Sequence, residues 1–324
     1  MSGPQISENY GPLLAIARDF GPDLILRDGW EPTACLVGQA LGVPYVAAPS
    51  GAAQVLDPVL IMALLNERRR EVGLPVNDDP NLIYRHGRLD CVPTPYSFAR
   101  REIPPAFVYR QPAADRRRES LPGWMADLPT DRPLVVAAIG GAGIMFLSEY
   151  GTAIRDAHPA LADFDPPRAL QAIIDGLSRL DCVAVVATGG IPVDRTAAGP
   201  DVHVVDYFAQ PMLLDCADLF VTHGGYNSIR EAMRAGVPMA VLPLFEDQFP
   251  NAVRVQELGL GERIARADPA SVADTCRRLL DDAATAREAR RAQRHMLTLP
   301  LVEAAVPHLE HIAKTGAMTS STRP

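Results

Sequence analysis

A short apolar run that leads into two glycines constrains the fold of this chain more than any other feature. Residues 219–221, Leu-Phe-Val, have the length and composition of a buried parallel strand, and Gly224 and Gly225 follow closely. Glycine lets the backbone approach a ligand. Asn227 or Ser228 is expected to cap the helix that follows. The amides and dipole of such a helix start favour an anion, so the pattern predicts a phosphate site between strand and helix.

A second strand, loop and helix come directly after the first. Gly236 is expected to end the first helix, and residues 239–242 have the composition of a strand. The loop after that strand carries Asp247 and Gln248, and Pro250 suits the first turn of the next helix. The carboxyl ends of parallel strands lie at one edge of a sheet. The two loops are therefore predicted to hold one ligand, a diphosphate with a sugar attached.

The same alternation of strands and helices extends toward the N-terminus. In the C-terminal half it predicts strands at 134–139, 183–187 and 202–205 and a helix at 168–180. In the N-terminal half it predicts helices at 13–20 and 33–41 and strands at 22–26 and 45–48, with Gly42 as a helix stop. This order is typical of an α/β fold built from doubly wound parallel sheets.

The stretch from Val204 to Leu260 resembles the nucleotide-diphosphate-sugar glycosyltransferases of the GT-B fold. The likeness rests on residues 222–231, Thr-His-Gly-Gly-Tyr-Asn-Ser-Ile-Arg-Glu, and on the Asp-Gln pair at 247–248. It is closest to the UDP-glucosyl/glucuronosyltransferase-like family, in its bacterial branch that decorates antibiotics and other natural products. The resemblance implies two Rossmann-like domains, an N-terminal one for the acceptor and a C-terminal one for the donor.

The resemblance also implies a role for each residue of a donor site. From the base to the sugar, the implied contacts are Tyr207 and Gln210 at the base, Glu231 at the ribose, His223, Gly224, Gly225, Asn227 and Ser228 at the diphosphate, and Asp247 and Gln248 at the sugar hydroxyls. Tyr207 stands where the family usually has a stacking tryptophan. In the N-terminal domain, Asp28 matches the acid that orients a catalytic histidine, and residues 91–99 resemble the last strand of that domain.

Simpler interpretations exist for these residues. His223 could be a hydrogen-bonded loop histidine, and Ser228 with Glu231 could form a capping box that only satisfies helix amides. The Asp-Gln pair could be a polar loop without a ligand, and Tyr207 could be a core or surface residue. The length of the motif favours the ligand roles.

Proline and charge density suggest where the chain divides. Prolines 122, 129 and 133 accompany the charged run 115–119, which is typical of an interdomain linker. We expect a partial N-terminal acceptor domain at 1–115, a linker at 116–133, a C-terminal nucleotide-sugar-binding domain at 134–313, and a disordered tail at 314–324.

Composition favours a cytoplasmic protein without nucleic-acid or membrane partners. The 324 residues carry a net charge of −8, which disfavours nucleic acid, and no apolar run is long enough to span a membrane. The cysteines are odd in number and lack metal-site spacing, which predicts reduced thiols and no bound metal: Cys35, Cys91, Cys182, Cys216 and Cys276.

The implied reaction moves a sugar from a UDP- or TDP-sugar to a hydroxyl of a small hydrophobic natural product. It would invert the anomeric centre and need neither metal nor cofactor. The glycine–histidine loop that carries the general base in the family has no counterpart here, and His86 does not match its position. We therefore expect an incomplete N-terminal domain, encoded in full by DNA upstream of Met1, and a chain that is inactive alone and poorly soluble.

Two other functions compete with this one. A non-catalytic relative that binds nucleotide sugar as an auxiliary or regulatory protein would need the donor site and no base. A nicotinamide-dependent oxidoreductase is disfavoured, because the glycines at 140–143 lack the third glycine of the dinucleotide fingerprint and no acid follows the next strand.

Overall fold

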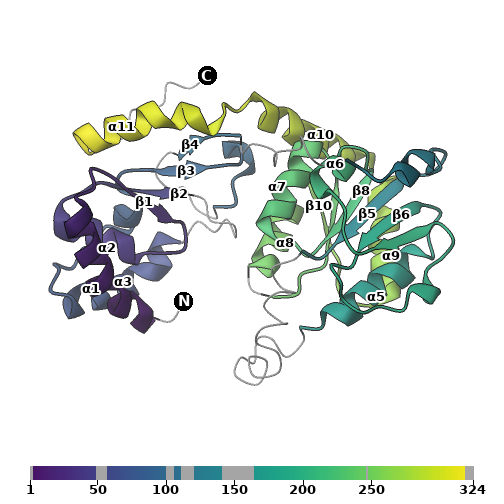
Figure 1. The fold of residues 1–324 in the computed structure, drawn as a ribbon, viewed down its shortest axis with the longest axis horizontal. Coiled ribbons are helices and arrows are strands. Elements are labelled where there is room, and N and C mark those ends of the chain that lie inside the picture. The colour runs from purple at the N-terminus through teal and green to yellow at the C-terminus, as the bar shows by residue number, and fades with distance from the viewer. Residues whose placement is uncertain are drawn as a thin grey trace. The chain divides into compact units, whose positions relative to one another are not determined.

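The computed structural model of the protein describes residues 3–48, 57–99, 106–110, 120–140, 164–245 and 247–317 (Figure 1). The chain forms two compact units. Unit 1 comprises Met1–Pro112 and Leu299–Pro324, and unit 2 comprises Ala113–Thr298. The expectations for residues 116–119, 141–143 and 318–324 lie outside the described residues.

Unit 1 is built on a parallel sheet whose strands follow sequence order, β1-β2-β3-β4. Its strands are β1 (Ile25–Asp28), β2 (Tyr45–Ala48), β3 (Arg88–Asp90) and β4 (Ala106–Val108), and its helices are α1 (Gly3–Phe20), α2 (Thr33–Leu41), α3 (Pro58–Glu71) and α11 (Val306–Thr315). Gly42 ends α2 with a φ of 68°, as predicted from the sequence. The expected strand at 91–99 is wrong. The strand lies earlier, at β3, and Pro93 and Pro95 accompany a 3₁₀ turn at Thr94–Tyr96, because proline cannot donate to a strand ladder.

Helices cover both faces of the unit 1 sheet (Figure 1). Tyr45 and Ala47 point to the face where α1, α2 and α3 supply Ile6, Leu36 and Leu65. On the opposite face, a second cluster holds these residues of β2, β3 and the C-terminal segment: Val46, Leu89, Ala305, Leu309 and Ile312. Side chains of successive strand residues point to opposite faces, so one short strand serves both layers.

The C-terminal segment divides the chain differently from the sequence expectation. Residues 299–313, expected in the C-terminal domain, belong to unit 1. The amide of Arg110 donates to the carbonyl of Pro300 at 2.6 Å, which ties the segment to the chain just after β4. The apolar residues of α11 then pack against the unit 1 sheet. The apolar pattern of α11 predicts that one of its faces is buried, but it does not specify which of the two sheets buries that face.

Unit 2 is a six-stranded parallel sheet in the order β10-β9-β8-β5-β6-β7. The strands are β5 (Leu134–Ala138), β6 (Val183–Ala187), β7 (Val202–Val205), β8 (Leu219–Thr222), β9 (Met239–Val241) and β10 (Gly261–Arg263). The chain builds outward from β5 through β6 to β7, then returns to the other side of β5 to form β8. This is the doubly wound arrangement predicted from the sequence, and its order reverses between β5 and β8, where such sheets bind ligands.

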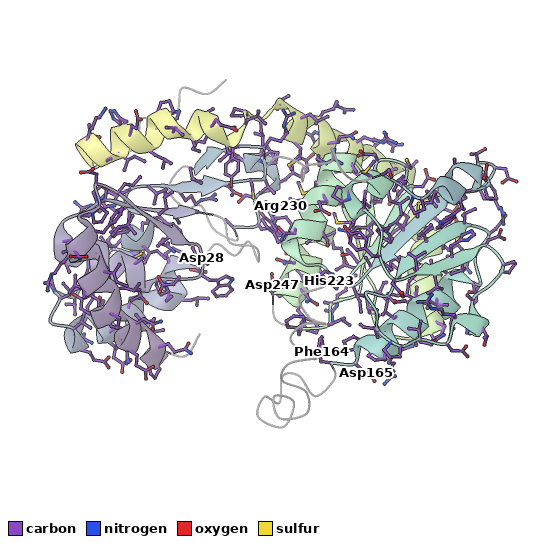
Figure 2. All side chains as sticks on the ribbon, viewed as in Figure 1. Asp28, Phe164, Asp165, His223, Arg230 and Asp247 are labelled. Atoms are coloured by element: carbon purple, nitrogen blue, oxygen red, sulfur yellow. The ribbon has the colours of Figure 1, made fainter. Side chains whose placement is uncertain are left out.

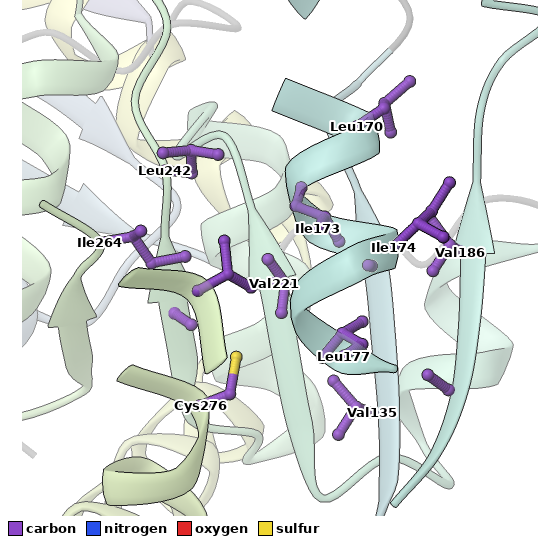
Figure 3. Close-up of a cluster of buried hydrophobic side chains, with 14 of the residues drawn as sticks. Val135, Leu170, Ile173, Ile174, Leu177, Val186, Val221, Leu242, Ile264 and Cys276 are labelled. Atoms are coloured by element: carbon purple, nitrogen blue, oxygen red, sulfur yellow. The ribbon is translucent and has the colours of Figure 1, made fainter. Parts of the chain in front are cut away.

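Among the described residues, six helices connect and cover the strands of unit 2. They are α5 (Pro166–Leu177), α6 (Gln210–Leu214), α7 (Tyr226–Ala235), α8 (Gln248–Glu257), α9 (Pro269–Asp281) and α10 (Ala283–Thr298). Figure 3 shows the core on one face, where Ile173 and Leu177 of α5 and Cys276 of α9 pack against Val135 and Val221 of the strands. Helices α7, α8 and α10 lie on the other side of the sheet (Figure 1).

Two further predictions concern the whole chain. All five cysteines are free, as expected. Among the residues that the structure describes, no helix is both long and apolar enough to cross a membrane.

Candidate functional site

Helix α7 begins without a side-chain cap at the point where the sheet order reverses. Gly225 occupies the N-cap position, and the first helical hydrogen bond runs from the amide of Ile229 to the carbonyl of Gly225 at 3.1 Å. The amides of residues 226–228 therefore have no partner within the helix. The expectation that Asn227 or Ser228 caps the helix is wrong, because the helix starts before them. Such an uncapped start offers donors and a partial positive charge to an anion.

The His223 ring lies in a slot between two glycines. A Cβ atom on Gly140 would lie 2.7 Å from His223 Cε1, and one on Gly225 would lie 2.4 Å from His223 Nε2. Gly140 follows β5, the neighbour of β8 in the sheet, and has a φ of +79°. Both positions must therefore lack a side chain for the ring to occupy this place, labelled in Figure 2. Sequence reasoning missed the role of Gly140, because strand order decides which loop faces the histidine.

Burial makes His223 a neutral side chain at neutral pH. It lowers the pKa of the imidazole to about 4, and the nearby Ala138 carbonyl offsets this only in part. The ring atom Nδ1 is buried and has no hydrogen bond of normal geometry among the described residues. A neutral imidazole can still donate one N–H to an anion.

Gln210, which the resemblance implies at the base, donates hydrogen bonds to the residues implied at the ribose and the diphosphate. Its Nε2 donates to Glu231 Oε2 at 2.7 Å and to Ser228 Oγ at 3.2 Å. Gln210 opens α6 after β7, whereas the other two lie on α7, so the cluster links two strand ends. The capping-box interpretation of Ser228 and Glu231 is wrong, since both lie inside the helix. The amide orients a carboxylate that can accept hydroxyl groups.

The remaining residues of the motif lie around the same helix start. Asn227 is exposed on the first turn of α7, and its Oδ1 accepts a hydrogen bond from Arg230 one turn later. The Arg230 guanidinium lies 5.1 Å from the centroid of the Tyr226 ring. Tyr207, just after β7, is 74% exposed, which rules out its interpretation as a core residue. An exposed aromatic face at a strand end is available for stacking.

Asp247 and Gln248 mark the beginning of α8, in the loop after β9. The Asp247 Oδ2 atom accepts from Asn251 Nδ2 at 3.0 Å. Gln248 is buried, and its Oε1 accepts from the amides of Leu244 and Phe245 at 2.8 and 3.2 Å. The loop is therefore held in one conformation by the side chains that follow it. Because all strands of the sheet are parallel, this loop and the α7 start share one edge.

In unit 1, the structure separates the two residues that could have served as acid and base. Asp28 is exposed at the carboxyl end of β1, where its Oδ1 accepts from the Trp30 amide at 2.8 Å. His86 accepts a hydrogen bond on Nδ1 from the amide of Tyr45 at 3.2 Å, at the amino end of β2. Tyr45 pairs with Ile25, three residues before Asp28, which is about 10 Å along the strand. His86 is therefore not the histidine that Asp28 would orient.

Comparison with known proteins shows which families and folds the chain is similar to. Residues 171–312 match the family described as erythromycin biosynthesis protein CIII-like, C-terminal domain. A zeaxanthin glucosyltransferase of Pseudescherichia vulneris is 26% identical over 306 residues, covering 83% of this chain and 69% of that protein. The NDP-glycosyltransferase YjiC of Bacillus subtilis (strain 168) is 33% identical over 270 residues, covering 80% of this chain and 62% of that protein.

Solved structures of GT-B glycosyltransferases share the fold. The spinosyn rhamnosyltransferase SpnG, which has also been solved in complex with thymidine diphosphate, superposes with a TM-score of 0.70 at 20% identity, covering 95% of this chain and 79% of that one. At this identity the similarity establishes the GT-B fold alone. The UDP-glucuronosyltransferases that the chain also matches are aligned over at most 25% of their length.

Proposed function

We propose that this chain, whose residues 171–312 match the erythromycin biosynthesis protein CIII-like C-terminal domain and whose fold is GT-B, transfers a sugar from a TDP- or UDP-sugar to a hydroxyl group. The acceptor is a small hydrophobic natural product, and unit 2 binds the donor. One observation carries the proposal. The amide of Gln210 ties Ser228 and Glu231 together beside the uncapped start of α7, which His223 precedes. The residues proposed for the ribose and for the diphosphate thus lie on the first turns of one helix.

The donor site stabilises the leaving group. As the glycosidic bond breaks, negative charge develops on the diphosphate, and the amides at the start of α7 point at that charge. The neutral His223 imidazole adds one N–H donor without a charge of its own. Glu231, oriented by Gln210, accepts hydroxyl hydrogens of the nucleotide ribose. The exposed Tyr207 ring offers a stacking surface to the base. These donors act without a metal, so we expect transfer in the presence of a chelator.

The acceptor half of the reaction uses unit 1. Asp28, at the carboxyl end of β1, corresponds to the acid that orients a histidine base in the resembling family, and this sequence has no counterpart of that histidine to take the proton of the attacking hydroxyl. Attack from the face opposite the diphosphate inverts the anomeric centre. The net charge of −8 disfavours nucleic acid as a partner. Five free cysteines favour a reducing compartment, so we place the protein in the cytoplasm.

Calorimetry with TDP, UDP and their glucose conjugates, in buffer with EDTA, tests the donor site. His223→Ala and Asp247→Ala should each weaken donor binding by about 1–3 kcal/mol, or roughly 5- to 150-fold. His203→Ala is the matched control, because His203 lies against Trp124 near the amino end of β7, opposite the carboxyl ends of the strands that carry the site. Absence of nucleotide binding by the wild type, or equal effects of the three substitutions, would refute the assignment.

The position of His86 favours a second candidate, a protein that binds nucleotide sugar without transferring it. In that case mass spectrometry with TDP-glucose and a panel of hydrophobic polyhydroxy acceptors should detect donor binding and no glycosylated product. Product formation that Asp28→Asn reduces at unchanged donor affinity would exclude this candidate and support the transferase.

A further inference from the structure

One buried side chain joins the two loops of the proposed donor site. Asn251 lies on α8 and is only 4% exposed. Its Nδ2 donates to the carbonyl of Gly224 at 3.0 Å and to Asp247 Oδ2 at 3.0 Å. A side-chain amide has two donor hydrogens on this nitrogen, held in one plane. The glycine loop before α7 and the acid loop before α8 are therefore connected through one rigid group.

Gly224 is a fixed end of this connection. Its φ is +87°, and a Cβ atom there would lie 2.7 Å from Val241 Cγ1. Its amide donates to Thr222 Oγ1 at 3.3 Å, so the peptide on each side of the residue has a defined orientation. The carbonyl that Asn251 contacts belongs to the same loop that holds His223 and starts α7. Any movement of this loop on binding a diphosphate changes the position of that carbonyl.

The Asp247 carboxylate is the other group that the Asn251 amide contacts. Its loop is already braced from the opposite side, since Gln248 accepts from the amides of Leu244 and Phe245, and the Phe245 ring lies 5.0 Å from that of Phe164 at 69°. These contacts hold the backbone of the loop, whereas Asn251 holds the carboxylate itself. A carboxylate fixed before the ligand arrives loses less conformational freedom when it binds a sugar hydroxyl.

We infer that Asn251 is a positioning residue that couples diphosphate binding at the glycine loop to sugar recognition by Asp247, an inference that rests on the proposed donor site. Asn251 contacts no ligand in this scheme. It orients the Asp247 carboxylate relative to the Gly224 carbonyl. The carboxylate is therefore positioned for the sugar hydroxyls when the diphosphate occupies the glycine loop. Asn251 lies outside residues 222–231 and the Asp-Gln pair at 247–248, on which the proposed roles rest.

The test compares two affinities, that for TDP and that for TDP-glucose, whose ratio measures what the sugar adds. In Asn251→Leu, which has a similar volume and no donor, TDP affinity should stay within about threefold of wild type, whereas the ratio should fall at least tenfold. Gln293→Leu is the matched control. The Gln293 amide also bridges two carbonyls, those of Arg234 and Ala235 at 3.1 and 2.9 Å, at the far end of α7. Gln293→Leu should lower the melting temperature by about as much as Asn251→Leu does, and it should leave the ratio of the TDP-glucose and TDP affinities unchanged.

Asn251→Asp provides a readout that a purely structural role would not move. At pH 7 it places a second carboxylate beside Asp247, and the two repel. At pH 5 a shared proton restores one hydrogen bond between them, so the ratio should recover at least threefold between pH 7 and pH 5, whereas Asn251→Leu should show no recovery.

The outcomes separate this inference from the proposed function. A wild type that binds neither nucleotide overturns the donor site. A wild type that binds both, with a ratio that Asn251→Leu leaves unchanged or that Gln293→Leu lowers equally, overturns the role of Asn251 alone. Equal affinities of the wild type for TDP and TDP-glucose would also overturn it, because the Asp247 carboxylate would then recognise no sugar.

Discussion

Alanine at position 225 should displace the His223 ring and so weaken diphosphate binding. Gly225 has φ −64° and ψ 138°, a conformation that alanine adopts without strain, so the effect of the methyl group is steric. Its Cβ would lie 2.4 Å from His223 Nε2 and 2.9 Å from Cε1. A normal contact between such atoms is about 3.5 Å, so the ring must move by roughly 1 Å.

The magnitude follows from the tightness of the slot. Overpacking of this kind costs about 1–3 kcal/mol, and loss of glycine at the N-cap adds a smaller penalty. For a unit the size of unit 2, that is a fall in melting temperature of roughly 2–12 °C. A donor displaced by about 1 Å no longer makes a good hydrogen bond to the diphosphate, which should weaken TDP binding by about 1–2 kcal/mol, or roughly 5- to 30-fold.

A double-mutant cycle with His223→Ala isolates the clash. Without the ring, the alanine at 225 has no clash. In the His223→Ala background, Gly225→Ala should therefore lower the free energy of unfolding only by the small penalty of losing the N-cap glycine, and the coupling energy should be about 1–2 kcal/mol. Gly123→Ala is the control, because its Cβ would have no atom within 4 Å. Additive stabilities in the cycle, or a Gly225→Ala variant with wild-type affinity for TDP, would refute the slot as the reason for the glycine.

Three further outcomes are expected. Because the pKa of His223 is about 4 when folded and 6.5 when exposed, the unfolded chain binds a proton that the folded one does not. The free energy of unfolding should therefore fall by about 3 kcal/mol as pH drops from 6.5 to 4, a loss that urea titrations of His223→Leu should lack. Glu231→Gln should weaken TDP binding by about 1–2 kcal/mol in calorimetry, and Gln210→Leu by a smaller amount, because the first removes the negative charge of the ribose acceptor and the second only its orientation. His86→Ala should lower the stability of unit 1 by about 1–3 kcal/mol in thermal melts, since the Tyr45 amide loses its acceptor, and should leave donor affinity unchanged.

The sequence alone determined the local elements of this protein and the class of its fold. The strands at 183–187 and 202–205 and the helix at 33–41 have the predicted bounds, and Gly42 and Gly236 end their helices in the left-handed conformation. These features depend on apolar runs, on helix stops and on the backbone freedom of glycine, all of which act over a few neighbouring residues. Strict alternation of strands and helices then leaves few topologies besides a doubly wound parallel sheet.

Only the tertiary structure decided which side chains meet. Gly140 flanks His223 because β5 and β8 are neighbours in the sheet, although the two residues lie 83 positions apart along the chain (223 − 140). The same holds for the contact of Gln210 with Glu231 and for the amide of Asn251 between two loops. Such contacts depend on strand order and register, and an apolar pattern that marks a strand as buried does not say which strand lies beside it. The sequence therefore indicated the loops that carry the chemistry, whereas packing of the sheet fixed the positions of their side chains.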